Sequence, residues 1–124
     1  MRIIRQIIFA GLLAAVPFAA NAQSGDLNAK ACNNKSGVEA IADCTAVIES
    51  LRYSGAMLAV VFNNRGRAYN NQKDYARAIA DFDEAIRLDP QFAQAFVRRG
   101  GAYYFKKDYA HGIADFDEAI GFVA

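Results

Sequence analysis

Residues 59–90 read AVVFNNRGRAYNNQKDYARAIADFDEAIRLDP, and residues 93–124 read AQAFVRRGGAYYFKKDYAHGIADFDEAIGFVA. Placed 34 residues apart, the two stretches are identical at 18 of 32 positions, including all of Ile79–Ile86 and Ile113–Ile120. Self-similarity at a fixed period of roughly 20–50 residues is the sequence signature of stacked repeats. The chain is therefore predicted to fold as repeated units that share one core.

Each half of the repeated unit has the apolar spacing of a helix. In the second half the apolar residues recur at intervals of three and four: Tyr75, Ala78, Ile79, Phe82, Ala85 and Ile86. That interval is typical of one face of an α-helix, and the strict alternation of a β-strand is absent. Asp74 and Asp108 precede the second helices, where an aspartate side chain accepts from free backbone N–H groups. Each unit is thus expected to be a pair of helices.

The positions shared by the two copies resemble the tetratricopeptide-repeat family. The family's pattern of aromatic, Gly, Tyr, Ala, Phe, Ala and Pro is seen as Phe62, Gly66, Tyr69, Ala78, Phe82, Ala85 and Pro90. The second copy carries Phe96, Gly100, Tyr103, Gly112, Phe116 and Ala119. The resemblance implies an all-α, helix-turn-helix repeat solenoid in which Gly66 lets the two helices approach closely. Lys73 and Lys107 stand where family members often have Gly; if the site needs a left-handed backbone, a lysine there stores some strain.

A degenerate first repeat is expected before the two clear copies. Ala40–Asp43 matches Ala78–Asp81 at an offset of 38, which places Cys44 where the next copy has Phe82. We therefore expect about three helix pairs in a domain of residues 23–124, with repeats at 26–58, 59–92 and 93–124. Cys32 falls roughly opposite Cys44, so a disulfide would join the first pair; two buried free thiols are the alternative.

The first 22 residues have the pattern of a secretory signal peptide. Arg2 and Arg5 precede an apolar run over residues 7–20, and residues 20–22 form a small-x-small cleavage site. A membrane anchor is the competing interpretation, but the run is shorter than the roughly 20 residues that span a bilayer. We expect an exported chain without a stable membrane anchor after cleavage, periplasmic in a bacterium, with secretion beyond the periplasm as the alternative.

Charge and motifs give no support for catalysis or nucleic-acid binding. Twelve basic and thirteen acidic residues follow residue 22, so no positive excess attracts phosphates. His111, the single histidine, has no nucleophile or carboxylate partner implied by its spacing. The repeated acidic positions are predicted to form a solvated helix face rather than a metal or acid–base site: Asp81, Asp83, Glu84, Asp115, Asp117 and Glu118. No enzyme activity, metal site or cofactor is expected.

The resemblance implies that the concave surface, lined by first helices, binds a protein or peptide partner. Carried over by position, the candidate binding residues are Asn63, Asn64, Arg67, Asn70, Gln94, Arg98 and Tyr104. Asparagine amides bond a peptide backbone in both directions, and arginine grips a carboxylate with two parallel hydrogen bonds. The alternative function is a structural subunit that forms a homo-oligomer through its C-terminal repeat, by Phe116, Ile120, Phe122 and Val123.

Overall fold

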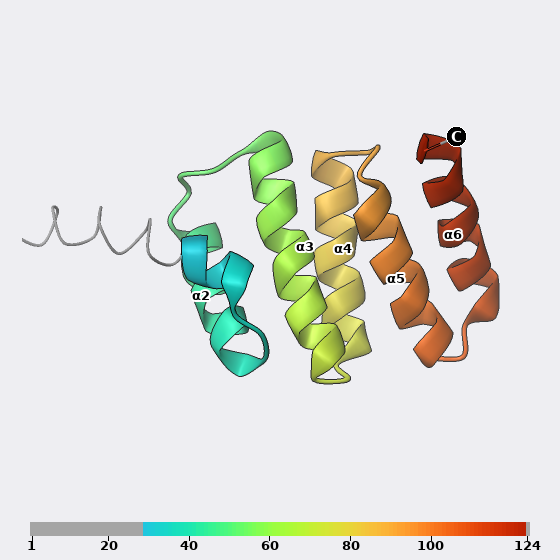
Figure 1. Ribbon diagram of the computed structural model, residues 1–124, viewed down its shortest axis with the longest axis horizontal. Coiled ribbons are helices and arrows are strands. Elements are labelled where there is room, and N and C mark those ends of the chain that lie inside the picture. The colour runs from blue at the N-terminus through green and yellow to red at the C-terminus, as the bar shows by residue number, and fades with distance from the viewer. Residues whose placement is uncertain (1–28, 124) are drawn as a thin grey trace, which may run out of the picture.

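The protein is a row of antiparallel helices (Figure 1), and the computed structural model describes residues 29–123. Residues 29–34 are helical and are followed by five longer helices: α2 (Val38–Glu49), α3 (Gly55–Asn71), α4 (Tyr75–Leu88), α5 (Ala93–Phe105) and α6 (Tyr109–Val123). No strand occurs within residues 29–123. The structure thus confirms an all-α helical repeat solenoid. The predicted signal peptide lies outside the described residues.

The turn inside each clear repeat follows from its sequence. Lys73 and Lys107 have φ of 60° and 66°, so the backbone is left-handed at both positions. Asp74 then accepts a hydrogen bond from the N–H of Arg77 at 3.3 Å, and Asp108 accepts one from that of His111 at 3.4 Å. Both predicted N-caps are confirmed, and they fix where α4 and α6 begin.

Close approach within each helix pair depends on glycine. The Phe82 side chain is fully buried, and a Cβ placed on Gly66 would lie 2.6 Å from Phe82 Cε1. In the next repeat a Cβ on Gly112 would lie 3.0 Å from the carbonyl oxygen of Gly100. Gly112 therefore permits a closer backbone contact in the α5–α6 pair, at the position that Ala78 fills in α4.

Successive repeats meet through small residues. Ala59, Ala85 and Ala95 form a fully buried cluster from α3, α4 and α5, with Ile86 and Phe92 packed against it. The rings of Tyr75 and Phe105 stack at 5.5 Å between centroids. Successive helix pairs therefore pack on one another along the row and do not stand as separate hairpins.

The prediction that the acidic positions all face water is wrong for Asp81 and Asp115. They are 4% and 5% exposed, and each accepts two hydrogen bonds, from Arg65 and Arg99 respectively. Burial raises the pKa of Asp81 above its usual value, and the Arg65 guanidinium offsets only part of this increase. The spacing of polar residues within one helix did not predict the burial of these two aspartates. The arginine that pairs with each of them comes from another helix, and a helical periodicity carries no information about it.

The same arginines also connect neighbouring repeats. Arg99 Nη1 donates to Asp83 of α4 at 2.8 Å, and Arg65 Nη1 donates to Thr45 of α2 at 3.1 Å. Arg65 and Arg99 thus each bind a residue of their own repeat and one of the preceding repeat, which sets the register of the stack.

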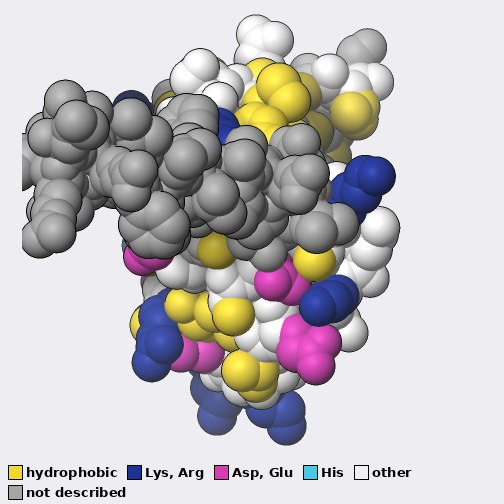
Figure 2. Space-filling model, turned by 90° about the vertical axis from the view of Figure 1, so that its left-hand side faces the viewer, with side chains coloured by type: hydrophobic (Ala, Val, Ile, Leu, Met, Phe, Trp, Pro, Cys, Tyr) yellow, Lys and Arg dark blue, Asp and Glu magenta, His cyan; other side chains and the backbone are white. Residues whose placement is uncertain are grey.

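A disulfide joins Cys32 to Cys44, as the sequence predicted. Both residues are buried, with Val47 of α2 and Val61 of α3 in the same cluster. The bridge holds helical residues 29–34 against α2 where the core is small. Viewed from this end of the row, hydrophobic, basic and acidic side chains lie next to one another on the surface (Figure 2).

Gly66→Ala is expected to lower the free energy of unfolding by about 1–3 kcal/mol, because its new Cβ overlaps the buried Phe82 ring. Gly101→Ala is the matched control, since no atom lies within 4 Å of its new Cβ. That change should raise stability by about 0.5–1 kcal/mol through helix propensity. Urea unfolding followed by circular dichroism measures both, and equal stability of the two variants would contradict the packing argument.

Candidate functional site

Hydrogen bonds connect α3 to α5 and to the N-terminal helical segment through the predicted binding residues. Asn63 donates to Gln94 Oε1 at 3.1 Å, and Asn70 donates to the carbonyl oxygen of Arg98 at 3.5 Å. On the other side of α3, Asn64 donates to Asn33 Oδ1. The structure therefore brings six of the seven predicted residues together, and we call them the polar row: Asn63, Asn64, Arg67, Asn70, Gln94 and Arg98.

Several polar atoms of the row are buried without a partner. Asn63 is 1% exposed, and its Oδ1 accepts no hydrogen bond; the buried Oδ1 of Asn70 accepts none either. Arg98 Nη1 is buried and donates to no acceptor in the part of the chain that the structure describes. An unsatisfied buried polar atom costs roughly 1–3 kcal/mol, so three close together require an explanation.

The two arginines of the row repel each other. Burial lowers the pKa of the Arg98 guanidinium, and the positive charge of Arg67 lowers it further. Arg67 Nη2 donates to the carbonyl oxygen of Asn33 at 3.4 Å. Within residues 29–123 neither arginine takes part in an ion pair. The row therefore combines positive charge with free donors and acceptors, a chemistry that suits an anionic group on a polar backbone.

Tyr104 lies apart from this network. Its side chain is 55% exposed and makes edge contacts with Phe105 and with Tyr109 of α6. No hydrogen bond of the described residues joins it to the polar row. Tyr104 therefore belongs to the C-terminal half of the surface, next to the start of α6.

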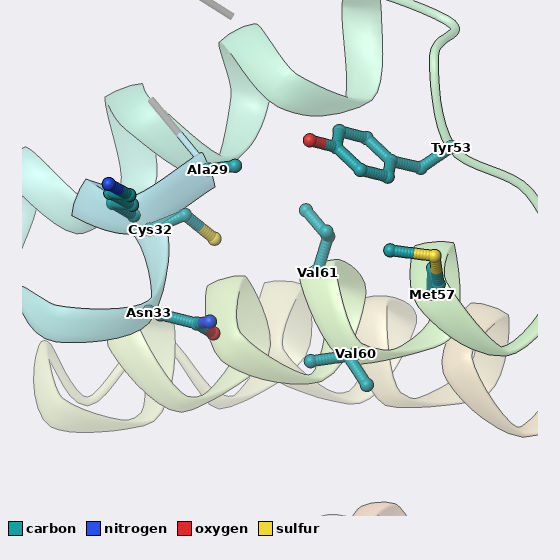
Figure 3. Close-up of a pocket in the computed structure, with 8 residues that line it drawn as sticks. Ala29, Cys32, Asn33, Tyr53, Met57, Val60 and Val61 are labelled. Carbon is teal, nitrogen blue, oxygen red and sulfur yellow. The ribbon is translucent and has the colours of Figure 1, made fainter. Parts of the chain in front are cut away.

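The sequence did not indicate Asn33 as a binding residue, nor did it indicate the cavity that lies next to it. The cavity has a volume of about 280 Å³ and lies between the segment that carries Asn33 and the start of α3 (Figure 3). Its lining residues are Ala29, Lys30, Cys32, Asn33, Tyr53, Met57, Val60 and Val61. Cys32, next to Asn33, was the available signal, because its pairing with Cys44 fixes where residue 33 lies.

Groups suited to metal binding are not found within residues 29–123, where no cluster of three His, Cys, Asp or Glu side chains occurs. His111 is exposed, and its Nδ1 lies 2.7 Å from Oδ2 of Asp108, the residue that precedes α6. Of the described helices, none is both long and apolar enough to cross a membrane.

Comparison with known proteins supports the tetratricopeptide assignment. Residues 59–92 match the family model described as tetratricopeptide repeat. A solved structure, the second TPR of Spaghetti (RPAP3) bound to the HSP90 peptide SRMEEVD, is similar with a TM-score of 0.68 and 28% identity. The similarity covers 90% of this chain and 97% of that one. No curated protein sequence matches this chain.

Arg67→Gln is expected to raise the stability of the ligand-free protein by about 0.5 kcal/mol at low salt, because it removes the repulsion of Arg98. The gain should shrink as salt screens the two charges. Arg87→Gln is the control, since Arg87 is paired with Glu84 at 2.9 Å. Thermal unfolding at two salt concentrations measures the effect; an Arg67→Gln protein less stable than the parent would contradict it.

Proposed function

We propose that this protein is a non-catalytic adaptor that binds an acidic peptide segment of a partner protein along the polar row. The observation that carries the proposal is Arg98, a half-buried arginine that takes part in no ion pair within residues 29–123 and whose charge adds to that of Arg67. A ligand carboxylate would neutralise this charge and accept from both guanidinium groups, which relieves the repulsion present in the free protein.

The amide side chains of the row supply the complementary contacts to a peptide backbone. Gln94 is exposed and Asn70 is half-buried, whereas Asn63 is 1% exposed and holds Gln94 in place by donating to its Oε1. An extended peptide presents N–H and C=O groups alternately along its length, so Gln94 and Asn70 are suited to hold its main chain while the arginines select its charge. Affinity from the main chain would make the site tolerant of the neighbouring peptide sequence.

The solved relative supports the class of ligand. That TPR is bound to the peptide SRMEEVD, in which three of the last four residues are acidic, and it shares the fold over most of this chain. Helical-repeat folds of this kind present extended surfaces for binding. An exported location is part of the proposal: the pattern of residues 1–22 and the Cys32–Cys44 bridge both suit an oxidising compartment.

Selection from a displayed library of random heptapeptides with free C-termini should enrich acidic sequences. Retested singly, these peptides should bind Arg67→Glu/Arg98→Glu at least tenfold more weakly, since a charge-assisted hydrogen bond contributes about 1.5–3 kcal/mol. Arg77→Glu/Arg87→Glu is the matched control, because both arginines lie on α4, outside the row. Enrichment without acidic residues, or equal loss in the two variants, would contradict the proposal.

A second candidate function, self-assembly, has one specific observation in its favour. Ile113 and Ile120 of α6 are 60% and 62% exposed, whereas Ile79, the repeat counterpart of Ile113, is 9% exposed. Ile86, the counterpart of Ile120, is covered by the α4–α5 contact. The same sequence is thus apolar surface in α6 and core in α4. A second copy of the chain, paired through the same face, would bury it, since most oligomers use such symmetric contacts.

If self-assembly operates, sedimentation velocity should show a dimer whose fraction rises with concentration, and Ile120→Lys should abolish it. Val38→Lys, on α2 at the other end of the row, is the control and should leave the dimer intact. A monomer at every concentration would exclude this second function without affecting the adaptor proposal.

A further inference from the structure

The cavity beside the disulfide is small and apolar, and Asn33, one of its lining residues, also contacts the polar row. Its volume of about 280 Å³ is at the lower limit of sites for whole small molecules, roughly 300 Å³, and suits a single side chain better. In Figure 3 the side chains of Cys32, Val61 and Tyr53 extend into the space between the helical segment and α3. Among the described lining residues, Lys30, Asn33 and the hydroxyl of Tyr53 supply the polar groups.

We propose that this cavity is a subsite for one large apolar side chain of the same acidic peptide, so that the peptide is bound at two points. The inference rests on the proposed function and adds to it a sequence requirement: an apolar residue three or four positions from the acidic residue that Arg67 and Arg98 bind.

The spacing follows from the geometry of α3. Met57, Val60 and Val61 line the cavity, and Arg67 lies six to ten residues further along the same helix. At about 1.5 Å per residue the two points are roughly 9–15 Å apart. An extended peptide advances about 3.3 Å per residue, so three or four of its residues cover that distance.

Asn33 connects the cavity to the charged end of the site. It lines the cavity, and it also accepts hydrogen bonds from Asn64 and Arg67 of the polar row. A peptide that lies between the two points would therefore follow a continuous surface. Lys30, at the cavity, adds a positive charge, which favours the acidic peptide as the occupant over an uncharged apolar one.

The disulfide fixes the wall that makes the cavity. Cys32 is buried and bonded to Cys44 of α2, so helical residues 29–34 are held against α2, which in turn packs on α3. A preformed pocket spares the ligand the cost of ordering its own site. The bridge thus has a function in binding as well as in stability.

Four fluorescein-labelled peptides test the subsite on the oxidised protein by anisotropy: SGLGSDD and its alanine version SGAGSDD, and the reversed pair DDSGLGS and DDSGAGS. In one orientation the leucine peptide should bind about tenfold more tightly than its alanine version, as expected for burial of the larger side chain. Val60→Trp fills the cavity and should abolish this preference while leaving the alanine peptide unchanged. Val38→Trp, on the exposed side of α2, is the matched control and should keep the preference.

The outcomes separate the subsite from the adaptor proposal. Arg98→Gln should weaken both members of the preferred pair equally; no effect on either, or no binding of any peptide, would overturn the adaptor function. Equal binding of leucine and alanine peptides in both orientations, with the Arg98 effect intact, would overturn the subsite alone. A large loss of thermal stability in ligand-free Val60→Trp would also overturn the subsite. It would show that the tryptophan clashes with side chains of the protein that already fill this space.

Discussion

The bidentate pairing of an arginine on each first helix with a buried aspartate on the second is the interaction on which the arrangement depends. Asp81 and Asp115 are almost inaccessible, so a slip of either helix would leave a buried carboxylate without its counter-charge. Leaving one partner of such a pair unmatched costs about 3–5 kcal/mol, a large share of the stability of a small domain. Because Arg65 and Arg99 also reach back to α2 and α4, the same interaction fixes the angle of each repeat on its neighbour.

Adjacent residues on α5 show how the two faces of a first helix divide structure from binding. Arg99 points toward α4 and α6, and its pKa is raised by hydrogen bonds to Asp115 and Asp83. Arg98 lies on the polar row, where burial lowers its pKa and no carboxylate of the described chain compensates its charge. The fold satisfies one guanidinium completely and leaves its neighbour unsatisfied, which is the pattern expected where a partner supplies the missing contacts.

In the first repeat, a disulfide bond stabilises the helix pair where the other two repeats have a phenylalanine. Cys44 is as fully buried as Phe82, but its side chain is too small to fill the space that a phenyl ring fills. The bond to Cys32 holds the short helical segment in place instead, and with it Asn33. The cavity beside α3 lies next to this bridge, with Cys32 among its lining residues.

The sequence by itself determined the helical repeat, its period, the N-caps at Asp74 and Asp108 and the pairing of Cys32 with Cys44. These features depend on local backbone preferences and on a residue pattern that occurs twice in the chain, 34 residues apart. Only the tertiary structure decided that Asp81 and Asp115 are buried and that Tyr104 lies apart from the polar row. Asn33 and the cavity likewise appear only when three segments meet in space. Burial of a charge and the shape of a cavity depend on which side chain arrives from a distant part of the chain, and the periodicity of a single helix carries no information about that.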